Sequence, residues 1–187
     1  MIHSCLDLIR TELNDYLRAQ TSTQENPIVL ANLRDQVEAQ ASNQVVMSLV
    51  DIAQQAWGGT DRDYIPQSNG GYITRKKPIN LNIHLLFSVH FTTERALEGI
   101  QHLSLVIAFF QAKNYFDTTN TPTLHTLQLD NLMVELVDLE PHEKSALWSC
   151  LGAHYLPSVL YKLSTIPVED TEAIGEEIPE VKKVIIQ

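Results

Sequence analysis

Alternating apolar positions between Ile79 and Phe91 give the clearest structural signal in the chain. Every odd position in this stretch is apolar, whereas most of the even positions are polar: Asn80, Asn82, His84, Ser88 and His90. A two-residue period places alternate side chains on opposite faces of a β-strand. The pattern therefore predicts one long strand over residues 78–91. We expect its odd face to line the core and its even face to form a polar surface available to a neighbouring subunit.

Two other stretches carry the three- to four-residue spacing of amphipathic helices, and start and stop residues indicate a third helix. Residues 2–18 form the first, and Thr92 or Thr93 begins a second that extends to about residue 111. Pro141 suits the first turn of a third helix, which ends near Gly152. The apolar stripe of the second helix is expected to comprise Leu97, Ile100, Leu103, Val106, Ile107, Phe109 and Phe110.

Shorter apolar or β-branched runs predict four further strands, at residues 28–30, 44–53, 132–139 and 158–166. Turn residues dominate residues 57–77, which indicates a long loop or hairpin tip before the long strand. Residues 114–122 are expected to form a polar turn. Helices and strands do not alternate regularly. The predicted fold is therefore α+β, with a mixed or mostly antiparallel sheet, helices packed on it and a long β-hairpin extension.

The C-terminal segment differs from the rest of the chain. We assign residues 1–167 to one α+β domain and residues 168–187 to an acidic C-terminal arm. The arm ends in a β-branched run that includes Val181, Val184, Ile185 and Ile186. Such a run can add a strand to the sheet of another subunit, or it can fold back on its own domain. Both arrangements are compatible with the sequence.

Composition narrows the functional classes. The chain has 187 residues and a formal net charge of −10, which argues against nucleic acid as a partner because phosphate binding requires concentrated Lys and Arg. The two cysteines, Cys5 and Cys150, lie in helical patterns and are expected to be buried structural thiols. No apolar run reaches the length of a membrane span, and the N-terminus lacks the order of a signal peptide. We expect synthesis in the cytoplasm.

Candidate catalytic groups are isolated from one another. His84 and His90 share the even face of the long strand, but six residues separate them by about 20 Å, too far for one metal ion. His142 and His154 flank a helix without an HExxH pattern, and no GxSxG motif occurs. We expect no enzymatic activity, cofactor, metal or small-molecule substrate. A small metal-binding enzyme remains an alternative hypothesis.

A set of short motifs along the chain carries a resemblance to a known family. The motifs are residues 78–88 (PINLNIHLLFS), Ala96–Leu97, Leu103–Ser104, Ile107, Phe109–Gln111, Leu147–Trp148, Leu151–Gly152, Tyr155–Ser158 and Tyr161–Lys162. The N-terminal pattern of Ile2, Leu6, Leu13 and Leu17, followed by residues 28–33, is similar too. Over about residues 1–167, the chain thus resembles the cap or tail-terminator family of phage-tail-like contractile injection systems of the virulence-cassette type.

The resemblance implies a structural subunit that forms a hexameric ring on the tail, contacts sheath and inner-tube proteins, and stops their polymerisation. It implies assembly in the cytoplasm and then incorporation into the particle, either released or membrane-anchored. A baseplate adaptor is the alternative tail component. Arg75, Lys76 and Lys77 form the only three-residue basic run. We predict that this run and the β-branched residues of the arm are partner contacts.

Overall fold

The computed structural model describes residues 2–21, 25–33, 43–55, 62–66, 72–76, 79–127, 129–168 and 174–178. The helices are α1 (Ile2–Thr21), the 3-10 turn η1 (Thr93–Arg95), α3 (Ala96–Ala112), α4 (Thr123–Thr126) and α5 (Pro141–Leu151). The strands are β1 (Ile28–Leu30), β2 (Gln44–Gln54), β3 (Arg62–Pro66), β4 (Tyr72–Lys76), β5 (Ile79–His90), β6 (Tyr115–Asp117), β7 (Asn131–Val137), β8 (Ser158–Val168) and β9 (Ile174–Ile178).

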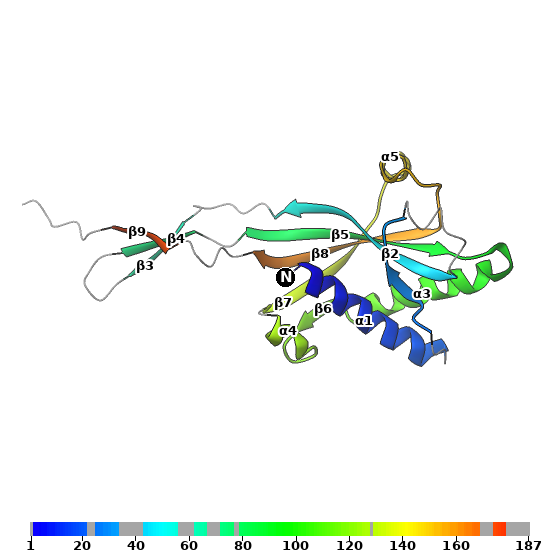
Figure 1. Cartoon of the computed structure of the whole chain (residues 1–187), viewed down its shortest axis with the longest axis horizontal. Helices are drawn as coiled ribbons and strands as arrows, with labels where there is room; N and C mark the ends of the chain where they lie inside the picture. Colours follow the sequence, from blue (N-terminus) through cyan, green and yellow to red (C-terminus); the bar gives the residue numbers. More distant parts are fainter. Residues whose placement is uncertain are drawn as a thin grey trace, which may run out of the picture.

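Two sheets organise these elements (Figure 1). A six-stranded sheet has the order β1-β2-β5-β8-β7-β6, in which β1 pairs with β2 in parallel and the other pairs are antiparallel. A three-stranded sheet has the order β3-β4-β9. We call the six-stranded sheet with its helices the body and the three-stranded sheet the extension. The predicted α+β fold with a mixed sheet is confirmed.

One face of the large sheet packs against α1 and α3 and forms the main core (Figure 1). The predicted stripe of α1 is confirmed, since Cys5, Leu6, Ile9, Leu13 and Leu17 are buried. On the sheet, the odd positions of β5 supply the core from residue 83 to residue 89. Aromatic rings tie α3 to the sheet: the centroid of Phe110 lies 4.5 Å from that of Tyr161 and 5.8 Å from that of Phe87.

The opposite face of the sheet is covered over only part of its length, by α5. Trp148 of α5 packs with Val46, Leu86 and Leu160. At the even positions beyond Leu86, Ser88 and His90 are also buried. The expectation that the whole even face of the long strand is a polar surface was therefore wrong for the half of β5 that begins at Leu86.

The exposed side of α3 also differs from the prediction. Leu97, Ile100 and Ile107 are exposed, whereas Gly99 and His102 face the interior. A Cβ atom added to Gly99 would lie 2.4 Å from Cγ1 of Val89, so this glycine permits a close approach of α3 to β5. That approach rotates the helix relative to its apolar stripe and leaves three large apolar side chains outside the core.

Polar groups fix the positions of several elements. Asn14 of α1 is buried; its amide donates to the carbonyl of Ile28 at 3.0 Å and its carbonyl accepts from the Ile28 N–H at 2.9 Å. Asn14 thereby joins α1 to β1. In α5, the backbone N–H of Glu140 donates to the side chain of Glu143, which completes a capping box, and Gly152 ends the helix at φ 63°. The predicted start and end of this helix are confirmed.

Some local details of the structure were not predicted or were predicted wrongly. The segment expected to be a polar turn contains β6, which is three residues long, and α4 follows it. Cys150 is exposed on α5, so only Cys5 is a buried thiol. Burial raises the pKa of Cys5 to about 11. Tyr155, which follows α5, is exposed and contacts Trp148 edge-on.

Candidate assembly surfaces

The extension projects beyond the end of the body at which β5 begins (Figure 1). It contains the segment predicted to be a hairpin tip: β3 and β4 pair from Arg62 opposite Lys76 to Pro66 opposite Tyr72. β9 completes the sheet by pairing with β4, with Ile174 opposite Arg75 and Ile178 opposite Tyr72. A C-terminal strand therefore folds back on its own chain, and the chain passes Ile178 at the distal end of the extension.

The residues predicted as partner contacts are only partly described. Arg75 and Lys76 belong to β4, in the extension. Lys77, Val181 and the run 184–186 lie outside the described residues. Their proposed role as contact residues stays a prediction.

A row of four polar residues crosses the open face of the large sheet, beside the area that α5 covers. Asp51 of β2 lies opposite His84 of β5, His84 lies opposite Lys162 of β8, and Lys162 lies opposite Glu135 of β7. We call this row the charge ladder. Nζ of Lys162 lies 2.5 Å from Oε2 of Glu135, and Nδ1 of His84 lies 3.3 Å from Oδ2 of Asp51 without hydrogen-bond geometry.

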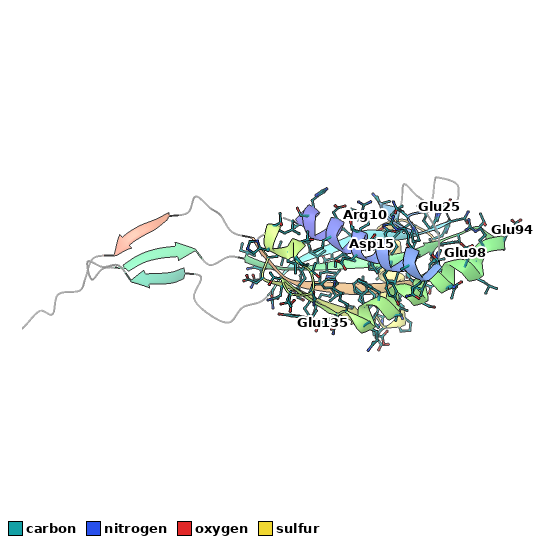
Figure 2. All side chains as sticks on the ribbon, turned by 90° about the horizontal axis from the view of Figure 1, so that it is seen from below. Arg10, Asp15, Glu25, Glu94, Glu98 and Glu135 are labelled. Carbon is teal, nitrogen blue, oxygen red and sulfur yellow. The ribbon has the colours of Figure 1, made fainter. Side chains whose placement is uncertain are left out.

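Chain geometry explains why these residues meet. The register between β2 and β5 shifts between Leu49 and Asp51, and such a bulge redirects a side chain. Figure 2 shows Glu135 apart from Arg10 and Asp15 of α1, on another part of the body. Because both of its side chains are partly exposed, the Lys162–Glu135 ion pair contributes about 0–1 kcal/mol to stability. The charge ladder is thus a polar surface that contributes little to the stability of the fold.

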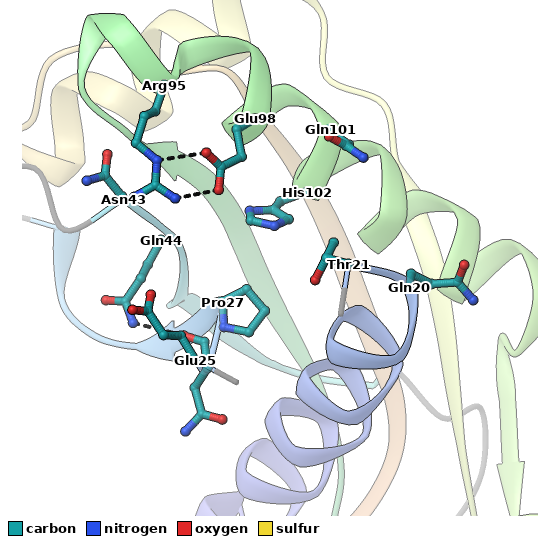
Figure 3. Close-up of a pocket in the computed structure, with 11 residues that line it drawn as sticks. Gln20, Thr21, Glu25, Pro27, Asn43, Gln44, Arg95, Glu98, Gln101 and His102 are labelled. Atoms are coloured by element: carbon teal, nitrogen blue, oxygen red, sulfur yellow. Dashed lines mark hydrogen bonds and ion pairs between the residues drawn. The ribbon is translucent and has the colours of Figure 1, made fainter. Parts of the chain in front are cut away.

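A second polar surface lies where the end of α1 meets the start of α3 (Figure 3). This second surface encloses a cavity of about 370 Å³. Arg95 and Glu98 face each other across two hydrogen bonds, of 2.7 and 2.5 Å, and this contact with Arg95 lowers the pKa of Glu98. Gln44 donates to the carbonyl of Asn26 at 2.9 Å. The charged groups of the Arg95–Glu98 pair thus satisfy one another.

The histidines do not assemble a reactive centre. Burial lowers the pKa values of His90 and His102, which favours their neutral forms. The ring of His102 packs against Phe91 with centroids 5.5 Å apart. Over the described part of the chain, no three His, Cys, Asp or Glu side chains are grouped to hold a metal ion, and no helix has the length and apolarity needed to cross a membrane.

Sequence reasoning identified His84 but none of its neighbours in the charge ladder. Asp51, Glu135 and Lys162 are visible as charged residues within predicted strands. Their alignment depends on strand order and on the bulge in β2, neither of which has a signature in a single sequence.

Together, the mixed sheet, the projecting extension and the polar open face characterise this α+β protein. The chain belongs to the Pvc16 N-terminal domain family, whose profile matches residues 6–181. No curated protein matches it.

Solved structures that share the fold include two, a terminator and a cap. One is the PVC sheath/tube terminator in the extended state, from an extracellular contractile injection system, with a TM-score of 0.63 and 15% identity over 100% of this chain and 64% of that chain. The other is the tube-terminating cap of the anti-feeding prophage, with a TM-score of 0.57 and 17% identity over 94% of this chain and 58% of that chain. This chain thus spans less than two thirds of the length of each structure.

Proposed function

We propose that this chain is a structural subunit of the cap, or terminator, of a contractile injection system. The observation that carries this proposal is that its whole length aligns with the fold of a sheath/tube terminator. In this role the subunit joins a ring, for which we propose six members, at the distal end of the tube and sheath. It acts by binding and not by catalysis. We propose that it assembles in the cytoplasm and becomes part of the particle.

The shape of the chain supports this role. Terminating a stack of rings requires one face that binds the last ring and another face that does not template a new one. The extension lies at one end of the body, whereas Glu94 marks the opposite end in Figure 2. A ring of such subunits, all oriented alike, would have two unlike faces.

We propose that the extension faces the sheath and inner tube. The basic residues Arg75, Lys76 and Lys77 would meet acidic groups there, because complementary charges set register and speed association. β9 ends at the distal end of the extension, so the arm residues Val181 and 184–186 follow from that point. We propose that they pair with an unpaired strand of the last ring.

The decisive experiment removes the protein from an assembling system and measures tail lengths by electron microscopy. We expect long, variable tails without it and uniform tails when it is restored. Loss of assembled baseplates would instead identify a baseplate adaptor. Normal, uniform tails in its absence would contradict the terminator role.

Complementation with variants tests the contact residues in the same assay. A chain lacking residues 179–187 keeps β9 and should fold, but it should cap fewer tails. A chain lacking residues 169–187 also loses β9; its body should still fold, and its attachment to the ring or sheath should be weaker. Reversing the charges of Arg75, Lys76 and Lys77 should likewise reduce capping, whereas Lys144→Glu on α5 serves as a matched surface control. Full capping by every variant would remove these residues from the interface.

A further inference from the structure

Each of the two edges of the large sheet is covered over only part of its length by a short terminal strand. At one end, β1 pairs only with residues 45–47 of β2, and Ser48 donates to the carbonyl of Ala31. Beyond that point, residues 49–54 pair with β5 alone among the described strands. We call residues 49–54 the free edge of β2.

The other end of the sheet has the same construction. β6 pairs only with residues 131–133 of β7, and the N–H of Val134 donates to the carbonyl of Asn114 at 2.8 Å. Residues 135–137 then pair with β8 alone among the described strands. We call these three residues the free edge of β7. Unpaired strand edges are templates for pairing with another chain.

Exposed apolar side chains accompany both free edges, and they lie on the same face of the sheet. Leu49 and Ile52 are 39% and 46% exposed on β2, and Leu136 is 58% exposed on β7. Ile52 lies opposite the core residue Ile83, and Leu136 lies opposite the core residue Tyr161. All three therefore lie on the face that α1 and α3 cover elsewhere.

We propose that the free edge of β2 in one copy of this chain pairs antiparallel with the free edge of β7 in the next copy, so that the large sheet continues around the ring. This inference rests on the proposed ring and specifies its contact. The occupant is a second copy because the two edges have matching apolar faces and lie at opposite ends of one sheet. A head-to-tail contact of this kind gives a closed ring when the rotation between copies closes, and an open filament when it does not.

The residues of the two free edges also fix the register between neighbouring copies. Leu136 lies opposite Ile52, which places Val137 opposite Asp51 and keeps the carboxylates of Glu135 and Asp51 from lying directly across from each other, where like charges repel. Within one copy, by contrast, Leu136 is level with Leu49, through Tyr161 and Leu85. The neighbouring copy is therefore shifted by two residues of β5, about 7 Å.

This shift is compatible with a closed ring. Because β2 of one copy pairs directly with β7 of the next, four strands, β2, β5, β8 and β7, repeat around the ring; spaced about 4.8 Å apart, they make each copy about 19 Å wide. A 7 Å shift across that width tilts the strands by roughly 20° from the ring axis, less than the tilt of closed barrels. β1 of one copy and β6 of its neighbour then lie at the two ends of the contact, where neither overlaps the paired residues. All extensions point toward the same rim.

Disulfide cross-linking tests the register directly. We would place Ile52→Cys and Leu136→Cys in one chain that also carries Cys150→Ser, which removes the exposed native thiol. Cα atoms opposite each other in antiparallel strands are about 4.5–5.5 Å apart, within the range of a disulfide. Oxidation should give a ladder of linked chains up to the ring size on a non-reducing gel. Each single-cysteine variant should stay unlinked, and mixing the two should give dimers only.

A second measurement uses native mass spectrometry of the full chain. Ile52→Arg should raise the apparent dissociation constant of the ring about tenfold, or about 1.4 kcal/mol. Leu97→Arg, on the exposed side of α3, should change it less than about twofold. Two results would overturn the edge pairing: rings that form without Ile52–Leu136 linkage, or an unaltered chain that stays monomeric. If the purified protein forms these linked rings but tails have normal lengths when the protein is absent, the terminator role alone is refuted.

Discussion

Replacing Gly99 with alanine tests the close approach of α3 to β5. The added Cβ would lie 2.4 Å from Cγ1 of Val89 and 2.7 Å from Cδ2 of Phe91. Neither neighbour can yield easily. The valine is restricted at χ1, and the phenylalanine ring is backed by His102, with centroids 5.5 Å apart. The helix must therefore move away from the strand.

Two effects of opposite sign decide the outcome. Alanine is about 1 kcal/mol more favourable than glycine within a helix. Overpacking a closely packed core costs about 1–3 kcal/mol, and the rigid neighbours of Gly99 place its cost in the upper part of that range. We expect Gly99→Ala to lower the free energy of unfolding by about 1–2 kcal/mol. For a domain of this size, the melting temperature should fall by roughly 2–8 °C.

Urea unfolding followed by far-ultraviolet circular dichroism measures this difference. Ala108→Gly is the matched control, because residue 108 is exposed on the same helix and the exchange is reversed. The control should lose about 1 kcal/mol through helix propensity alone. If Gly99→Ala instead gained about 1 kcal/mol, propensity would dominate. The close approach of α3 to β5 would then be refuted.

Two further predictions concern buried polar groups. Asn14→Leu should lower the free energy of unfolding by roughly 2–4 kcal/mol, because it leaves the buried N–H and C=O of Ile28 without their partner; a loss below about 0.5 kcal/mol in urea unfolding would show that this bridge is dispensable. For His102, burial lowers the pKa below its ordinary value near 6.5, so the unfolded chain binds more protons and stability should fall as pH drops below that value. Urea midpoints at pH 7.5 and 5.5 should differ less in His102→Gln; an equal difference in both proteins would exclude His102 as a cause.

The parts of the fold that sequence could predict carry their own local signals. The two-residue period located β5, the spacing of Leu6, Leu13 and Leu17 located α1, and Pro141 bounded α5. By contrast, β6 and α4 are too short for any periodicity. The exposed face of α3 was misjudged because its residues are apolar on several sides. Its contacts with β5 through Gly99 and with α1 through Phe109 decide which side is buried.

The candidate surfaces depend even more on contacts between distant residues. Ser88 and His90 are polar, yet both are buried, so polarity alone did not identify the open face. The open face begins where that cover ends, at His84 and the charge ladder. Likewise, the free edges exist because β1 and β6 stop after three residues. Strand length was predictable for β1, but the order of strands in the sheet was not.

The direction of the strands connects the proposed edge pairing to termination. β2, β5 and β8 run along the long axis of the body, and the extension lies at one end of them (Figure 1). Copies joined edge to edge in one continuous sheet share that direction, so every extension must emerge at the same rim. The opposite rim would carry the turns around η1 and the end of α5, without an extension. In a ring built in this way, the proposed contacts with a partner ring would lie on one side only, and growth would stop without a separate inhibitory part.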